Sequence, residues 1–306
     1  MKCFHTPVLL KETLELLHIE PGGLYVDCNL GMAGHATAIL EKGSPRVRLL
    51  GIDADPESIE IAMTRLQPFG KAALTVNEGF ENLEELCARY DFRPVKGILF
   101  DLGISSFQLE DKSRGFSFSF DAPLDMRFNP DQSLTAATIV NTFSEAEIAS
   151  ILRTYGEERH HRRIAREIIA HRPVNTTLQL VKIVERKLGA GRGRIHPATR
   201  TFQALRIAVN RELANLEKVL EQTLNVLSPG GRLVVISYHS LEDRLVKEFM
   251  RRESRDCLCP PDVPVCVCGH SPTLKLVNRK AVTPSVTEME ANPRSRSAKL
   301  RAAERL

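Results

Sequence analysis

The sequence has no long apolar run and no strong excess of charge, and both absences limit what the chain can be. No segment approaches the roughly 20 apolar residues that a membrane-spanning helix needs, and residues 1–18 lack the apolar stretch of a signal peptide. The net charge of the 306 residues is only +4, so binding of nucleic acid would have to depend on local basic patches. Because 42% of the residues are hydrophobic, we expect a full core and a soluble, cytoplasmic protein.

Between Leu24 and Gly103, apolar runs that suit buried strands alternate with amphipathic runs that suit helices. This alternation is typical of a parallel sheet with helices on both faces. The strand-like runs are LYVDCN (24–29), RLLGIDAD (48–55), ALTVNEGF (73–80) and VKGILFDLG (95–103); the helical runs are AGHATAILEKG (33–43), PESIEIAMTRL (56–66) and ENLEELCARY (81–90). We therefore predict an α/β, Rossmann-like, doubly wound sheet.

The alternation stops after Gly103 for almost a hundred residues. A loop rich in Phe, Ser and Asp (107–134) comes first, and helical segments follow it, the first of them opened by the capping box of Ser144 and Glu147. Two more helices are expected near 157–171 and 177–188. We predict an inserted, mainly helical subdomain at 107–198, within a discontinuous domain made of 1–106 and 199–306.

The sheet is expected to resume after the insertion. Apolar residues spaced by threes and fours predict one long helix from Ala198 to Leu227, which the Ser228-Pro229-Gly230-Gly231 segment would end. The run GRLVVISY (231–238) then suits a buried parallel strand. The segments 274–280 and 297–304 could pair as a closing hairpin at the edge of the sheet.

The chain lacks the G-x-G-x-x-G motif, which argues against a dinucleotide because that motif brings backbone N–H groups onto a pyrophosphate. S-adenosylmethionine has no phosphate. Its binding needs a close turn, a carboxylate for the ribose, an apolar slot for the adenine and an acidic environment for the sulfonium. The segment Gly31–Gly34 with Asp53, Phe80 and Asp101 would meet these needs at successive strand ends. The alternative is that the acidic residues cap strands and Phe80 belongs to the core.

Eight motifs, spread over nearly the whole chain, carry a resemblance to a known family. The chain resembles the bacterial methyltransferases that modify the exocyclic N4 of a cytidine in 16S ribosomal RNA. The motifs are HTPVLLKE (5–12), GIDADP (51–56), DLGISSFQL (101–109), RGFSFSFDAPLDMRF (114–128), YGEERHHRRIAR (155–166), HPATRTFQALRIAVNREL (196–213), ISYHSLEDRLVKEF (236–249) and NPRSRSAKLRAAERL (292–306).

The resemblance implies a class I S-adenosylmethionine-dependent methyltransferase fold, with an insertion that helps to recognise RNA. The family's cofactor contacts fall on Ala33, Gly34, His35, Asp53, Phe80, Asp101 and Gln108. The chain departs from the family at Asn29, where a threonine is usual, and at Ala33 and Ala122, where glycines are usual. If either glycine position has a positive φ, an alanine there would strain the turn.

The chemistry requires hydrogen-bond acceptors for the amino protons of the cytosine, whose N4 lone pair is delocalised into the ring. The Asn/Asp-Pro-Pro-aromatic motif of many amino-methyltransferases is absent, and Asp101-Leu102-Gly103-Ile104-Ser105 stands in its place. The candidate acceptors are Asp101, the carbonyls of 103–105, Ser105 and Asp125. His239 could position the base, or it could simply cap the helix that starts near Ser240.

Two basic stretches are candidates for binding the phosphates of RNA. The first, 153–172, carries Arg162 and Arg163 beside an apolar stripe, although a solvated helix paired with its own glutamates is an alternative. The second is the glycine-rich segment 192–196, with Arg194 and His196, which leads into Arg200. Together with Arg127 of the DMRF segment, these residues are the candidate substrate contacts.

Four of the seven cysteines form two C-x-C pairs, Cys257 with Cys259 and Cys266 with Cys268, across a proline-rich turn. Four thiolates can hold zinc tetrahedrally and so order a loop that has little apolar content of its own. The usual structural spacing is C-x-x-C, however, so free thiols are the alternative. Cys3, Cys28 and Cys87 stand in ordinary context and suit small buried side chains.

These observations favour a cytoplasmic enzyme that methylates N4 of a cytidine in 16S rRNA of the small ribosomal subunit, with S-adenosylmethionine as cofactor. One rival is a methyltransferase that acts on amino groups of DNA or of another RNA. Another is a non-catalytic RNA-binding assembly factor on the same fold. We expect neither a membrane nor DNA among the partners, and the sequence leaves the oligomeric state open.

Overall fold

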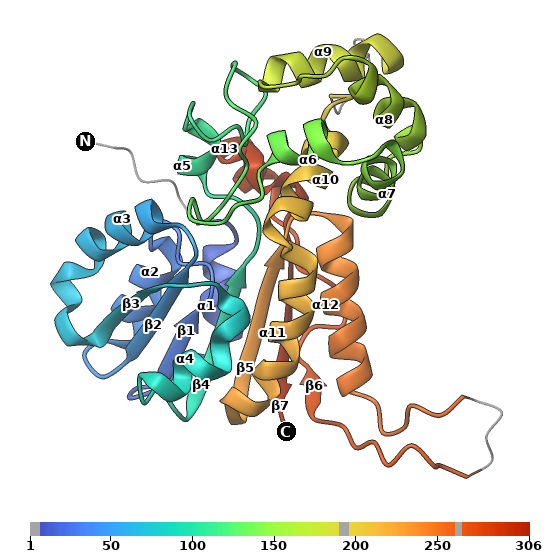
Figure 1. Ribbon diagram of the computed structural model, residues 1–306. Helices are drawn as coiled ribbons and strands as arrows, with labels where there is room; N and C mark the ends of the chain where they lie inside the picture. Colours follow the sequence, from blue (N-terminus) through green and yellow to red (C-terminus); the bar gives the residue numbers. More distant parts are fainter. Residues whose placement is uncertain (1–6, 190–195, 261–264) are drawn as a thin grey trace. The chain divides into compact units, whose positions relative to one another are not determined.

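The computed structural model describes residues 7–189, 196–260 and 265–306, and the chain divides into two compact units (Figure 1). The first unit comprises Met1–Gly103 and Leu213–Leu306, and the second comprises Ile104–Glu212. The second unit therefore includes residues 199–212, which we had predicted to belong to the discontinuous domain. No helix in the described ranges is both long and apolar enough to cross a membrane.

The first unit is built on a seven-stranded sheet with the strand order β3-β2-β1-β4-β5-β7-β6. The neighbours from β3 to β5 pair in parallel, whereas β7 runs antiparallel to both β5 and β6. The predicted edge pairing of 274–280 with 297–304 is confirmed by β6 and β7. The strands are β1 Leu24–Asp27, β2 Arg48–Asp53, β3 Ala73–Asn77, β4 Val95–Asp101, β5 Leu227–Ser237, β6 Leu274–Leu276 and β7 Lys299–Arg305.

Helices cover both faces of this sheet because alternate residues of each strand point to opposite sides. In β4, Ile98 and Phe100 pack with α4, α11 and α12, and Leu99 points the other way, toward α1, α2 and α3. The predicted doubly wound fold is confirmed, and it is that of the class I S-adenosylmethionine-dependent methyltransferases. The helices of this unit are α1 Leu10–Leu17, α2 Gly34–Gly43, α3 Pro56–Leu66, α4 Leu83–Arg89, α11 Glu212–Val226, α12 Ser240–Glu253 and α13 Val286–Ala291, with short 3₁₀ helices η1 Gln67–Ala72, η2 Phe80–Asn82 and η3 Pro293–Ser297.

The second unit is helical and has a hydrophobic core of its own, which includes Leu152, Ile164 and Leu205. Its predicted start signal is confirmed: the Ser144 hydroxyl accepts the N–H of Glu147, and the Glu147 carboxylate accepts the N–H of Ser144. The helices of this unit are α5 Ser106–Glu110, α6 Ala136–Thr142, α7 Glu145–Gly156, α8 His161–Ala170, α9 Thr177–Leu188 and α10 Thr199–Asn210.

The prediction of one continuous helix from Ala198 to Leu227 is wrong. The chain breaks at Arg211, whose φ of 53° and ψ of 33° are left-handed, so α10 ends at Asn210 and α11 begins at Glu212. The Asn210 side chain accepts the N–H of Phe128 at 2.7 Å and donates to the carbonyl of Met126 at 2.7 Å. These bonds tie the end of α10 to a distant loop, and apolar periodicity gives no sign of them.

Replacing Asn210 with Ala should destabilise the second unit by about 2–4 kcal/mol, because the Phe128 N–H and the Met126 carbonyl would each lose a buried partner. Asn175→Ala is the matched control: this asparagine is exposed in the same unit, and its loss should change stability by less than about 0.5 kcal/mol. Urea unfolding followed by circular dichroism measures both. Equal, small effects of the two substitutions would contradict a structural role for Asn210.

Candidate active site

Three aspartates lie at the carboxyl ends of adjacent parallel strands of the first unit. Asp27 ends β1, Asp53 ends β2 and Asp101 ends β4. Strand β1 pairs with both of the others, so the three ends meet at one edge of the sheet. This is the edge at which open α/β sheets bind their ligands.

Asp53 holds the loop that follows β1. Its Oδ2 accepts the N–H of Gly31 at 2.7 Å, and its Oδ1 accepts the N–H of Asp55 at 2.9 Å. A carboxylate can accept about four hydrogen bonds, so fixing the loop leaves this group able to bind a ligand hydroxyl. Asp53 is partly exposed, as such a role requires.

Asp101 has two neighbours from other elements of the unit. The hydroxyl of Tyr238, which directly follows β5, donates to Oδ1 at 2.7 Å. The Nε2 atom of the buried His35 lies 3.4 Å from Oδ2. Burial and the nearby Asp101 charge raise the pKa of Tyr238 well above its usual value, so the phenol stays protonated and donates. We had not predicted Tyr238, although its place at the end of a strand could have indicated it.

Asp27 was not among the predicted site residues, although it ends a strand at the same edge. Its carboxyl group is almost fully buried. Burial is the main cause that raises its pKa to about 7, and the charges of Asp101 and Asp53 raise it further, while His35 opposes them. Burial and the two neighbouring carboxylates thus make ionisation of Asp27 unfavourable in the folded chain.

The loop between β1 and α2 has the strained geometry that the departure from the family suggested. Ala33 has a φ of 57° and a ψ of 34°, a left-handed conformation that costs a non-glycine residue roughly 1–2 kcal/mol. Gly31 also has a positive φ, of 49°. At Gly34, an added Cβ would lie 2.5 Å from Cγ of Pro7, so only glycine fits there without movement of Pro7.

Phe80 begins the short helix η2, just past β3. Its ring packs edge-on against that of Phe100 in β4, with 5.8 Å between the centroids. Phe80 is only partly buried, so it offers an apolar surface as well as a contact to the core. The structure is compatible with both of the roles that we considered for this residue.

Three further candidates lie in the second unit. Ser105 and Gln108 form a capping box at the start of α5: the Ser105 hydroxyl accepts the N–H of Gln108, and Gln108 Oε1 accepts the N–H of Ser105. Asp125 accepts from Nε and Nη2 of Arg127 at 2.8 and 2.7 Å. Burial opposes ionisation of Asp125, but the hydrogen bonds and charge of Arg127 outweigh it and lower the pKa of the carboxyl.

His239 is the N-cap of α12, as the capping alternative predicted. Its Nδ1 atom accepts the N–H of Glu242 at 3.4 Å, and Glu242 Oε2 accepts the N–H of His239 at 3.3 Å. Its Nε2 atom also lies 3.0 Å from Oε1 of Glu242. The backbone N–H and the Nδ1 atom of His239 are therefore both bonded to Glu242 at the start of its own helix.

The predicted basic residues differ in how much of each side chain faces solvent. Arg162 and Arg163 are exposed on α8, opposite its buried Ile164. The His196 ring packs at a tilt of 34° against Phe118, and its Nε2 atom lies 3.3 Å from Glu185. The exposed Arg200 makes a long contact with the carbonyl of Glu157.

Arg127 is engaged more fully, because besides Asp125 it donates to the carbonyls of Pro130 and Gln132. These bonds mainly stabilise the loop that contains Arg127. Arg194 and Cys3 lie outside the described residues.

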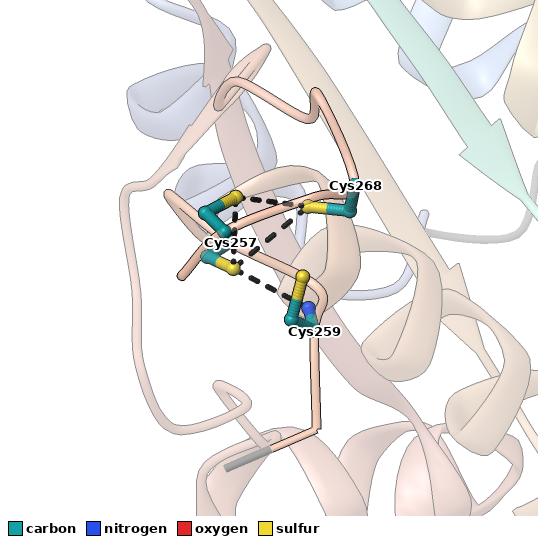
Figure 2. Close-up of side chains that lie close together, drawn as sticks. Cys257, Cys259 and Cys268 are labelled. Carbon is teal, nitrogen blue, oxygen red and sulfur yellow. Dashed lines mark hydrogen bonds between the residues drawn. The ribbon is translucent and has the colours of Figure 1, made fainter. Parts of the chain in front are cut away.

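The four clustered cysteines converge in the loop between α12 and β6. Figure 2 shows the side chains of Cys257, Cys259 and Cys268 close together. All four Sγ atoms lie within 4.8 Å of one another. By contrast, Cys28 and Cys87 are buried in the core of the sheet, as expected for structural thiols.

Replacing Ala33 with Gly tests the strain in the loop. The substitution removes a buried methyl group and adds unfolded-state entropy, but it should relieve roughly 1–2 kcal/mol of strain, so stability should change little. Ala36→Gly is the control, since Ala36 is also fully buried but lies inside α2, where the same atoms are lost without any relief. We expect Ala36→Gly to be the more destabilising by at least about 1 kcal/mol in urea unfolding. Equal losses would show that Ala33 is unstrained.

The raised pKa of Asp27 predicts a specific dependence of stability on pH. Between pH 4 and 7 the folded state keeps a proton that the unfolded state has lost, so this group makes the protein less stable as pH rises and has no further effect above pH 7. Asp27→Asn should match the wild type near pH 4 and exceed it by up to ~4 kcal/mol at pH 8. Chemical unfolding at several pH values measures the difference, and a difference that is constant with pH would refute the assignment.

Comparison with known proteins gives matches over nearly the full length of the chain. The model of the MraW methylase family matches residues 2–306. The chain is 56% identical over 302 residues to a protein from Dehalococcoides mccartyi named ribosomal RNA small subunit methyltransferase H, covering 99% of this chain and 86% of the relative. A protein of the same name from Thermomicrobium roseum is 52% identical over 305 residues, covering 99% and 94%.

Among solved structures, an rRNA methylase from Streptococcus thermophilus aligns with 99% of each chain, at 12% identity and a TM-score of 0.43, and the assignment does not depend on it. From the family match and from the two relatives above, we conclude that this chain belongs to the MraW methylase family.

Proposed function

We propose that this protein transfers the methyl group of S-adenosylmethionine to the exocyclic N4 of a cytidine in 16S rRNA of the small ribosomal subunit. The observation that carries the proposal is the full-length match to relatives named ribosomal RNA small subunit methyltransferase H, at 56% identity for the Dehalococcoides protein. The choice of N4 of cytidine comes from the motif resemblance. The substrate also implies that the protein works in the cytoplasm.

The residues at the edge of the sheet fit the cofactor electrostatically. Asp27, Asp53 and Asp101 gather at this edge, and burial, together with the charges of Asp101 and Asp53, raises the pKa of Asp27 to about 7. A cationic sulfonium would lower the free energy of the ionised carboxylates, whereas a pyrophosphate would raise it. Asp53 is the carboxylate proposed to bind the ribose hydroxyls, and the exposed side of Phe80 is proposed to line the adenine slot. The loop from Gly31 to His35 would form the close turn.

When bound, S-adenosylmethionine supplies an electrophilic methyl carbon. In the transfer, the C–N bond would form as the C–S bond breaks, the electron pair would go to sulfur, and the amino proton would pass to an acceptor of the protein or to water. The protein's contribution to such an in-line displacement is mainly to hold the reacting atoms in line and to exclude water. Acceptors that bind the amino protons would turn the nitrogen lone pair toward the methyl carbon.

Asp101 is the acceptor that we favour. It is already oriented by the Tyr238 hydroxyl, and its second oxygen lies near His35. Asp125 is paired with Arg127 at both oxygens, which makes it a weaker base and favours a role in shaping its loop. Ser105 remains a candidate through its hydroxyl, and His239 is proposed as a positioning residue at most, because it is held by Glu242.

The exposed arginines of the second unit are proposed to bind the phosphates of the RNA. Arg162 and Arg163 project from α8 on the side opposite its buried stripe. Arg200 at the start of α10 and the neighbouring His196 would extend the contact. Arg166 is a weaker candidate because it pairs with Glu145 of α7 at 3.5 Å.

A metal ion has no necessary part in this reaction, because transfer from a sulfonium supplies its own leaving group. Any ion held by the four cysteines would therefore be structural. A non-catalytic assembly factor on the same fold is the second candidate function, and the strained Ala33 is the observation that favours it.

Tritiated methyl transfer tests the proposal. We expect label from S-adenosylmethionine to appear in 16S rRNA when small ribosomal subunits are the substrate, and N4-methylcytidine to be found there by mass spectrometry. Label only on DNA, or only at another nucleotide, would contradict the assignment. Absence of cofactor binding by a folded protein in isothermal titration would support the assembly factor.

Asp53→Ala should weaken cofactor binding by about 10- to 100-fold, which corresponds to the roughly 1.5–3 kcal/mol of a hydrogen bond to a charged group. The control is Glu60→Ala, which removes the same charge from the exposed face of α3 and should leave binding unchanged. Isothermal titration compares the two variants, and equal affinities would remove Asp53 from the site.

A further inference from the structure

The loop between α12 and β6 brings four thiols together without a hydrophobic core to support them. None of the described residues of this loop, 254–260 and 265–273, is buried, and Val265 and Val267 are 70% and 80% exposed. The base of the loop is closed by bonds from the backbone N–H and hydroxyl of Thr273 to Glu253. Beyond that base, the cysteine cluster is the main feature that draws the two arms of the loop together (Figure 2).

The distances among three of the sulfur atoms are close to those of a tetrahedral metal shell. The Sγ atoms of Cys257 and Cys266 are 3.4 Å apart, those of Cys257 and Cys268 are 3.8 Å apart, and those of Cys266 and Cys268 are 3.5 Å apart. Zinc bound by four thiolates at about 2.3 Å places its sulfurs about 3.8 Å from one another. Disulfide bonding would instead bring two sulfurs to about 2.05 Å.

Backbone N–H groups point at the sulfurs, as they do where thiolates must be stabilised. The N–H of Leu258 donates to Sγ of Cys268 at 3.4 Å, that of Val267 donates to Cys259 at 3.4 Å, and that of Cys259 donates to Cys257 at 3.3 Å. Each C-x-C pair thus accepts at least one hydrogen bond from a backbone N–H, either of the other arm of the loop or of its own arm. Donors to sulfur favour the ionised form over the neutral thiol.

We propose that Cys257, Cys259, Cys266 and Cys268 bind one zinc ion as a closed, structural tetrathiolate site. Four adjacent thiolates repel one another strongly unless a cation lies between them, and zinc supplies two positive charges at the centre of the cluster. Four sulfurs fill the tetrahedral shell, so His270, two residues past Cys268, is not a ligand. The ion takes no part in methyl transfer; it fixes the loop.

Metal analysis of the full-length protein tests the site. The chain is purified without a polyhistidine tag or chelator, and its zinc content is measured by inductively coupled plasma mass spectrometry. We expect about one zinc per chain. Cys266→Ser should lose most of it, whereas Cys87→Ala, which removes a thiol from the core, and His270→Ala should both retain it. Replacement of zinc by cobalt(II) should give the strong visible absorption of a tetrahedral thiolate site.

The variants also separate this proposal from the proposed function. Cys266→Ser should still bind S-adenosylmethionine in isothermal titration, which shows that it is folded, while protease cleavage within 254–273 becomes at least tenfold faster. Wild-type protein free of metal, with its four thiols titrating rapidly with a thiol reagent or found as disulfides, would overturn the zinc site. Loss of zinc in His270→Ala would overturn the four-sulfur ligand set. Neither result would bear on methyl transfer.

Discussion

The burial of the Asp27 carboxyl beside two other carboxylates at one edge of the sheet is the constraint on which the rest of the site depends. Parallel pairing of β1 with β2 and β4 brings Asp27, Asp53 and Asp101 to the same edge, although their negative charges repel one another. The Tyr238 hydroxyl donates to Asp101 and the Gly31 N–H donates to Asp53, while burial, with smaller contributions from these two charges, raises the pKa of Asp27 to about 7. A cationic ligand bound at this edge would stabilise the ionised form of Asp27.

Neighbouring elements of the first unit provide hydrogen-bond donors to the carboxylates at this edge. The sheet extends past β4 to β5 and so delivers Tyr238 to Asp101, while the loop after β1 presents the Gly31 N–H to Asp53. The basic residues proposed to bind RNA lie in the other unit, which has its own core. Binding of a cationic cofactor and of a polyanionic substrate are thereby assigned to surfaces of opposite charge.

Much of the fold could be predicted because its signals are local. The alternation between 24 and 103 and the capping box at Ser144 involve neighbours within a few residues. The break at Arg211 could not be predicted, since the partners of Asn210 lie 82 and 84 residues away. The hydrogen bonds of Arg127 to carbonyls of its own loop and the convergence of four sulfurs likewise depend on how loops fold. Residue type alone could only mark these side chains as candidates.

Proton release on cofactor binding tests the central claim most directly. Isothermal titration near pH 6.5, in two buffers of different ionisation enthalpy, counts the protons released when S-adenosylmethionine or the uncharged-sulfur product S-adenosylhomocysteine binds. The account predicts that the sulfonium drives a fraction of a proton off the wild type, that the product releases less, and that Asp27→Asn abolishes the difference. Equal proton release by the two ligands, or release unaffected by Asp27→Asn, would contradict it.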